Sequence, residues 1–152
     1  MKTGVVISSR LVLVLIPFIS GCSGAQPANL GLRDGRLAPC PSTPNCVSSQ
    51  SLDKEHHVEP LSYSSPTSDA MAALKNIILQ KKRTKIVTET SIYLHAEFTS
   101  ALWRFVDDVE FSCDENAKLI HMRSASRMGH SDLGVNRKRL EDIRKSWAAS
   151  GM

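Results

Sequence analysis

A polar segment, RSASRMGHSDLGVNR, is the stretch best equipped for chemistry, and it runs from Arg123 to Arg137. It holds three arginines, several hydroxyl or amide side chains, and two glycines that bend the backbone. Arginine and serine side chains can cradle a carboxylate or phosphate, helped by the N-terminus of a following helix. His130, Ser131 and Asp132 are consecutive, so they cannot converge as a catalytic triad by themselves. The segment predicts a binding site, or alternatively a rigid connection whose charges hold one another.

Asp107 is a carboxylate that the strand pattern places on an apolar face. An unpaired buried carboxylate is costly, so it needs a partner, and the nearest basic candidates are Arg127, Arg137 and Arg139. The candidate binding and organising residues are Asp107, Arg123, Ser124, Ser126, Arg127, Ser131, Asp132, Asn136 and Arg137.

A second set of side chains has the chemistry of a metal site. His95 and Glu97 lie two apart on one predicted strand face, where Glu110 and His121 can join them. Imidazoles and carboxylates can hold a divalent metal that activates a water molecule. The alternative, which we favour, is a hydrated sheet face with weak ion pairs, each contributing below about 1 kcal/mol. No cofactor is indicated.

Cys40 and Cys46 are separated by five residues in CPSTPNC. In an oxidising compartment this favours a disulfide, which would stabilise the fold by about 2–3 kcal/mol. The alternative is zinc held with His56 or His57, but the spacing matches no tight zinc pattern. Cys113 is left without a disulfide partner, and its place near the apolar face predicts a buried thiol.

The first 21 residues have the form of an export signal. Lys2 and Arg10 give a positive start, and the apolar run from Leu11 to Ile19 is too short for a spanning helix of about 20 residues. The following Ile-Ser-Gly-Cys resembles the lipobox of bacterial lipoproteins, which predicts a lipid on Cys22. Acyl chains contribute about 0.8 kcal/mol per buried methylene, so two or three of them anchor durably.

Ser23 follows Cys22, where Asp resembles an inner-membrane retention mark, so we expect the outer membrane, facing the periplasm. Residues 22–38 are rich in Gly, Ala and Pro and predict a flexible tether, and residues 39–149 predict one domain. The net charge of +4 falls to +2 when Lys2 and Arg10 are removed, which gives no indication of nucleic-acid binding.

Periodicity predicts helix, strands and helix in that order. A helix is expected from Thr67 to Arg83, capped by Thr67 or Ser68, and a last helix near Asn136, which is its candidate cap. Strands are expected at Lys85–Glu89, Ile92–Thr99, Phe105–Cys113 and Lys118–Ala125, with a short edge strand in His56–Leu61. The expected fold is α+β, with a single antiparallel sheet of about four to five strands and two helices on one face. This topology is like the helix-grip folds, by analogy alone.

The last two strands can be aligned if Asp114–Ala117 form the turn between them. Cys113 would then face Lys118, and Asp107 would lie beside Ser124. The alignment gives one apolar and one charge-complementary ladder, with Phe111 beside Ile120, Val109 beside Met122, Glu110 beside His121, and Asp108 beside Arg123.

Three blocks carry a family resemblance: CPSTPNCVSSQ, YLHAEFTSALWRFVDDVEF and IHMRSASRMGHSDLGVNRKRLEDIR. With these blocks the chain resembles the DUF1499 proteins, a family of unknown function. The resemblance implies an exported or membrane-associated single domain, and it supplies no reaction, cofactor or catalytic residue.

Together these patterns favour a lipid-anchored, non-enzymatic binding or interaction module of the cell envelope. Its expected partners are the membrane, through the lipid, and an envelope protein or small anionic ligand. The alternatives are a metal-assisted hydrolase on the polar sheet face and a purely structural envelope protein.

Overall fold

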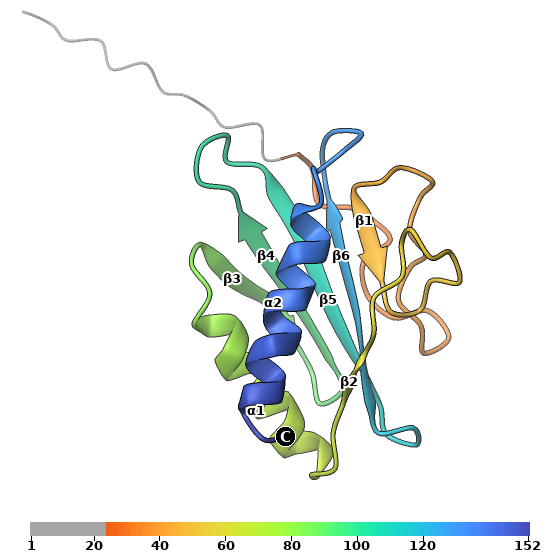
Figure 1. Ribbon diagram of the computed structural model, residues 1–152, viewed down its shortest axis with the longest axis vertical. Coiled ribbons are helices and arrows are strands. Elements are labelled where there is room, and N and C mark those ends of the chain that lie inside the picture. The colour runs from red at the N-terminus through yellow and green to blue at the C-terminus, as the bar shows by residue number, and fades with distance from the viewer. Residues whose placement is uncertain (1–23) are drawn as a thin grey trace, which may run out of the picture.

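The computed structural model describes residues 24–152 and shows one antiparallel sheet of six strands. The predicted signal peptide, Cys22 and Ser23 lie outside the described residues. The strand order is β1-β6-β5-β4-β3, and β2 also pairs with β6 (Figure 1). Across the described residues we find no helix with the length and apolar character needed to traverse a bilayer.

The helices and strands follow the predicted order. The two helices are α1 (Thr67–Leu79) and α2 (Val135–Ala149). The strands are β1 (Cys46–Ser48), β2 (Leu61–Ser62), β3 (Thr84–Glu89), β4 (Tyr93–Thr99), β5 (Val106–Asp114) and β6 (Leu119–Ser126). The α+β class with a single antiparallel sheet is confirmed. The strand count is slightly higher than expected because two short strands, β1 and β2, both pair with β6.

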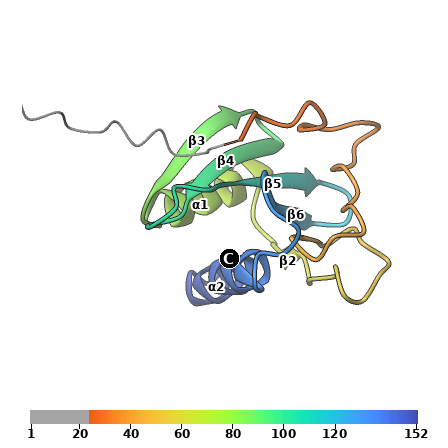
Figure 2. The same cartoon turned by 90° about the horizontal axis from the view of Figure 1, so that it is seen from above.

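The core lies between the sheet and the two helices, which cover the same face (Figure 2). Val109 and Phe111 of β5 point into it and are fully buried. They meet a stripe on each helix with the spacing of an amphipathic helix: Leu74 and Ile78 from α1, and Leu140, Ile143 and Trp147 from α2. Burial of each such side chain contributes about 1.5–3 kcal/mol.

The hairpin of β5 and β6 has the predicted faces but a register shifted by two residues. Phe111 lies opposite Met122 and Cys113 opposite Ile120. The turn begins one residue later than expected because the Asp114 carboxylate accepts the backbone N–H groups of Asn116 (3.0 Å) and Ala117 (2.9 Å). A shift of two keeps every side chain on its face, but it replaces the predicted neighbours. The observed pairs are Asp107 with Ser126, Asp108 with Ala125, Val109 with Ser124, and Glu110 with Arg123.

Both helix boundaries differ from the prediction. α1 ends at Leu79, before Arg83, which adopts a left-handed backbone (φ 56°), and Pro66 precedes its first turn in place of a side-chain cap. α2 begins after Gly134. The Asp132 carboxylate accepts the N–H groups of Gly134 (3.0 Å) and Asn136 (2.7 Å), so Asp132 performs the capping predicted for Asn136.

The polar face of the sheet is covered by the N-terminal segment, residues 24–45 (Figure 2, orange). Gly31 N–H donates to Glu110 Oε1 at 2.8 Å, and Leu37 is buried and donates its N–H to Gln50. The Cys40–Cys46 disulfide closes the end of this segment next to β1. The described part of the predicted tether therefore lies against the domain, because its backbone finds one acceptor on β5 and another on Gln50, just after β1.

Asn136 joins this segment to the rest of the fold. The side chain is fully buried, and its Nδ2 donates to the backbone carbonyl of Asn45 (2.9 Å) and to Ser126 Oγ (2.9 Å). Its Oδ1 accepts from Ser124 and Arg139. One amide thus satisfies groups from α2, β6 and the disulfide loop.

We expect Asn136→Ala to lower the free energy of unfolding by about 2–4 kcal/mol, since it leaves several buried polar groups without partners. Urea denaturation measures this. Asn116→Ala is the matched control, because the Asn116 side chain is exposed in a turn. Equal stability of the two variants would contradict a joining role for Asn136.

Candidate functional site

Side chains from three neighbouring strands meet on the polar face beneath the N-terminal segment. His95 of β4 lies opposite Glu110 of β5, and Glu110 lies opposite Arg123 of β6. His95, Asp108, Glu110 and Arg123 are all at most 4% exposed. The expectation of a hydrated face with weak pairs is therefore wrong. A charge removed from water must be compensated inside the protein.

Asp108 is one of two carboxylates at the centre of this network, and each accepts three hydrogen bonds from the described residues. The two oxygens of Asp108 accept a bidentate pair from Arg127 (2.7 and 2.9 Å), and His95 Nε2 lies 2.8 Å from Oδ1. Burial alone would raise the pKa of Asp108, but the hydrogen bonds from Arg127 and His95 outweigh it and hold the pKa below its ordinary value. The bonds to Asp108 and to Glu97 likewise raise the pKa of Arg127.

Glu110 is the second centre. Arg123 Nη1 donates to its Oε2 (3.0 Å), while the Tyr93 hydroxyl and the Gly31 backbone N–H donate to its Oε1 (both 2.8 Å). Burial, followed by the nearby Glu110 charge, raises the pKa of Tyr93, so the phenol remains a donor. The chain segment that covers the face is thus part of the same network.

Beside Arg123 lies a cavity of about 320 Å³ between the sheet and the N-terminal segment. Arg123 forms part of its wall, and within residues 24–152 its Nε is the one buried side-chain nitrogen or oxygen without a hydrogen-bond partner. Such an atom normally costs about 1–3 kcal/mol, so Arg123 is the member of this network whose hydrogen bonding is incomplete. The remaining wall comes from prolines, the disulfide and small polar side chains: Pro27, Asn29, Pro39, Cys40, Pro41, Thr43, Asn45, Asp108, Ala125 and Ser126.

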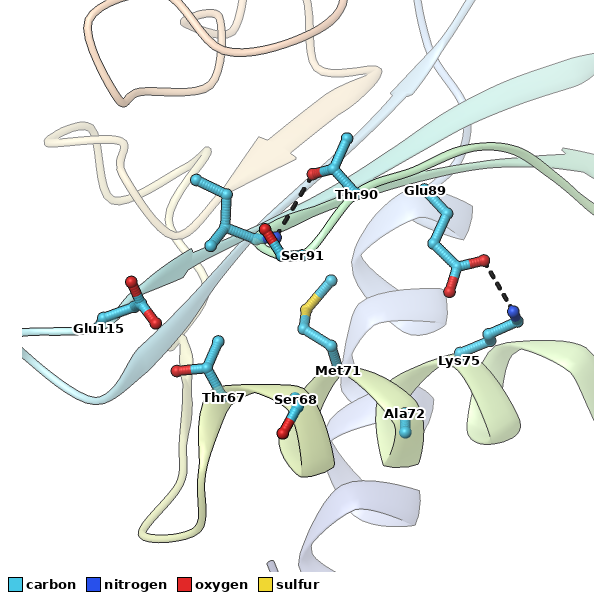
Figure 3. A pocket seen from close by; sticks show the side chains of 10 residues that line it. Thr67, Ser68, Met71, Ala72, Lys75, Glu89, Thr90, Ser91 and Glu115 are labelled. Carbon is cyan, nitrogen blue, oxygen red and sulfur yellow. Dashed lines mark hydrogen bonds and ion pairs between the residues drawn. The ribbon is translucent and has the colours of Figure 1, made fainter.

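A larger cavity, of about 770 Å³, lies between the start of α1 and the turn joining β3 to β4 (Figure 3). Its charged pair, Lys75 with Glu89 at 2.7 Å, is about two-fifths exposed. Figure 3 shows the two side chains pointing toward each other across its edge. Both charges are already paired with each other and exposed to solvent. This cavity is therefore a weaker candidate for a specific polar ligand than the cavity beside Arg123.

The predicted binding segment is divided between different parts of the structure. Arg123 and Arg127 belong to the network on the polar face. Arg137 donates to the backbone carbonyls of His57 and Glu55, both at 2.7 Å, and Ser131 is exposed. The segment is therefore neither one cradle nor only a connection. It supplies two arginines to a site whose other wall lies about 80–100 residues earlier in the chain.

A family model described as "Protein of unknown function (DUF1499)" matches residues 36–146. The chain belongs to the DUF1499 family. No curated protein matches the sequence. The match includes the disulfide loop and all of β3–β6, while Pro27, Asn29 and Gly31 precede it. The DUF1499 region thus carries the charged network, and the residues before it complete the cover.

Asp107 forms a separate pair on the helix-facing side of the DUF1499 sheet. Arg139 of α2 donates to its carboxylate, so one of the three predicted partners is confirmed. The same guanidinium donates to Ser124 Oγ (3.0 Å) and lies 4.9 Å from the centre of the Phe98 ring. Asp107, Ser124 and Asn136 hold α2 against the sheet, so their place in this domain is structural.

The predicted metal-binding set is not gathered into one cluster. His95 pairs with Asp108, Glu97 with Arg127, and Glu110 with Arg123, while His121 Nδ1 lies 3.3 Å from Ser49 Oγ. Burial lowers the pKa of His121. Among the described residues, no three His, Cys, Asp or Glu side chains are grouped so that they could hold a metal ion.

The cysteines of the DUF1499 domain follow the prediction. Cys40 and Cys46 form the disulfide, with Cα atoms 5.6 Å apart, and Cys113 is a free, buried thiol. Burial raises the pKa of Cys113 to about 11. His56, the alternative zinc ligand, instead has its Nδ1 2.8 Å from the backbone carbonyl of Cys46.

Sequence reasoning missed the residues that cover the site. Tyr93, Gly31, Asn29 and Pro27 were not among the candidates, although each contacts Glu110 or lines the cavity. Tyr93 carried a usable signal, since it lies on the same predicted strand face as His95. The three N-terminal residues carried none, because an irregular segment without periodicity does not indicate what it covers.

Asp108 makes the stability of the site depend on pH. Its folded-state pKa lies below the unfolded value of about 3.9, so its stabilising contribution is present above that value. The contribution is lost as the pH falls through the folded-state pKa. We expect Asp108→Asn to cost about 3–5 kcal/mol at pH 7, because Arg127 and His95 lose a charged partner, and less at pH 3. Urea denaturation at both pH values measures the difference.

Asp142→Asn, at an exposed position of α2, is the matched control and should change stability little at either pH. A loss for Asp108→Asn that is the same at pH 3 and pH 7 would show that the ionised carboxylate is not what stabilises the fold.

Proposed function

We propose that this DUF1499 protein is a lipid-anchored envelope protein whose domain binds a small anionic ligand beneath its N-terminal segment. The observation that carries the proposal is Arg123, a buried arginine in the wall of the cavity whose guanidinium is bonded to Glu110 through Nη1 and has no partner at Nε among the described residues. The export signal and lipobox-like sequence support the anchor. The Cys40–Cys46 disulfide is consistent with an oxidising compartment.

Arg123 is preorganised to receive an anion. Glu110 holds its Nη1, and the strand fixes its backbone, so little conformational freedom remains to be lost on binding. A guanidinium presents its N–H donors in one plane. Within the part of the chain that the structure describes, the only side-chain acceptor that Arg123 meets is Glu110, at Nη1, so a carboxylate or phosphate in the cavity can accept from the rest of this guanidinium. Because the side chain is only about 5% exposed, this bond would form in a weakly screened environment.

The rest of the wall limits what such a ligand can be. Asp108 also lines the cavity, but Arg127 and His95 already compensate its charge. The side chains of Asn29, Thr43 and Ser126 can bond to hydroxyl or amine groups, and the prolines offer apolar contact. At about 320 Å³ the cavity is at the small end of ligand sites. The chemistry fits a small acid that also carries hydrogen-bond donors.

Binding is the function favoured over catalysis because the acidic and basic groups here hold one another. His95 is bonded to Asp108, and Glu110 accepts from Arg123, Tyr93 and Gly31. Groups fixed in this way orient a ligand, whereas a general base must be able to reach a substrate proton.

Native mass spectrometry of the protein purified from a periplasm tests the proposal. We expect an organic adduct on the wild-type protein, and at least a tenfold lower occupancy in Arg123→Lys, which keeps the charge near Glu110 but loses the planar Nε donor. Arg144→Lys, on the surface of α2, is the control and should retain the adduct.

A second measurement covers a ligand lost during purification. Succinate or inorganic phosphate should raise the melting temperature of the wild-type protein and of Arg144→Lys, but not of Arg123→Lys. A ligand at 100 times its Kd adds about 2.7 kcal/mol. A bare chain mass together with no shift from either anion would reject the binding function and leave a structural envelope protein.

A further inference from the structure

Large apolar side chains are exposed in two loops at one end of the molecule. The β4–β5 loop, residues 100–105, exposes Leu102 (77%), Trp103 (67%) and Phe105 (43%). The loop between β6 and α2, residues 127–134, exposes Met128 (48%) and Leu133 (94%). Figure 1 shows both loops at the same end of the sheet. We call these five side chains the apolar end.

The described chain also begins at this end (Figure 1). Gly24 packs so closely on the second loop that an added Cβ would lie 3.0 Å from Arg127 Cβ and 3.1 Å from Met128 Cγ. The second loop is also bonded to the strand that follows the first loop, because Arg127 N–H donates to the carbonyl of Val106, the first residue of β5 (3.2 Å). The start of the described chain and both loops are therefore held together as one surface.

The short distance along the chain between Cys22 and Gly24 indicates what would lie against this surface. Cys22 precedes Gly24 by two residues, and two residues span at most about 7 Å. Acyl chains on Cys22 would therefore enter a bilayer beside Met128. A lipid on Cys22 would hold the apolar end close to the bilayer surface.

Leu133 supports a use outside the fold. Its backbone is left-handed (φ 53°), a conformation that is unfavourable for leucine and easy for glycine or asparagine. Its side chain is 94% exposed, so it adds nothing to the core. Leucine at this position destabilises the left-handed backbone and adds no packing to the folded domain. Its side chain would be stabilised by contact with an apolar phase outside the protein.

We propose that the apolar end inserts into the lipid–water interface next to the anchor and so sets the orientation of the domain on the membrane. Tryptophan is enriched at such interfaces because its ring is apolar and its N–H is polar. Arg104 is exposed within the first loop. Arg83 is exposed next to that loop, where its Nε donates to the carbonyl of Thr99, the last residue of β4. Each guanidinium can bind a lipid phosphate. This inference rests on the lipid anchor in the proposed function and is independent of the ligand cavity.

Contact quenching of tryptophan tests the inference. The full mature lipoprotein is reconstituted into vesicles of phosphatidylethanolamine and phosphatidylglycerol with brominated acyl chains, since bromine quenches only a ring that reaches the chains. Trp147 is the internal reference, because it is 4% exposed and bonded to the Ser62 carbonyl. We expect the Trp103 emission, taken as wild type minus Trp103→Phe, to fall by more than half, and the Trp147 emission remaining in Trp103→Phe to change little.

Leu133→Gly separates membrane contact from folding. It should reduce the quenching of Trp103 while the melting temperature stays the same or rises, because glycine relieves the left-handed backbone. Leu52→Gly is the matched control, since Leu52 is fully exposed in the segment between β1 and β2. It should leave the quenching unchanged.

The two ways of failing are distinguished by the intact mass. A protein that carries the lipid mass on Cys22 but shows no quenching of Trp103 would overturn the inserted surface and leave the anchor standing. A protein without the lipid mass would overturn the anchor and, with it, this inference.

Discussion

The fold depends on β5, a strand that is buried on both faces although one of these faces carries charged side chains. Every residue of β5 from Val106 to Cys113 is buried. Its apolar side chains are covered by the helices, and Asp108 and Glu110 on the other face are covered by the N-terminal segment. Two buried carboxylates require compensating charges, and Arg127 supplies one to Asp108 while Arg123 supplies one to Glu110. The cover, the network and the cavity all follow from that requirement.

The face pattern of the sheet was predictable because it depends on alternation, which a period of two preserves. The hairpin register was not, because it depended on which residue begins the turn, and Asp114 settles that by accepting two backbone N–H groups. Asp107 was predictable as a buried carboxylate that needs an arginine, and it has Arg139. The cover over Glu110 was not predictable, since Gly31 contributes only a backbone N–H, which every residue except proline possesses.

The network also explains why a site could be concealed within a sequence that shows no catalytic motif. Paired charges are already satisfied by one another, so they contribute shape and rigidity more than reactivity. What distinguishes Arg123 is that its Nε is buried without a hydrogen-bond partner in the described chain, although its Nη1 is bonded to Glu110. A site built in this way depends on geometry across three strands and an irregular segment, and residue types alone do not reveal it.

The position of the covering segment has a consequence for how the chain reaches its native state. Gly31 bonds to Glu110 across 79 residues of sequence, and Cys46 pairs with Ala125 of β6. Contacts of such long range require closure of large loops and slow the folding of a domain. The part of the chain made first must wait for β5 and β6 before it can dock. Because that segment supplies part of the cavity wall, the cavity forms only when the segment docks.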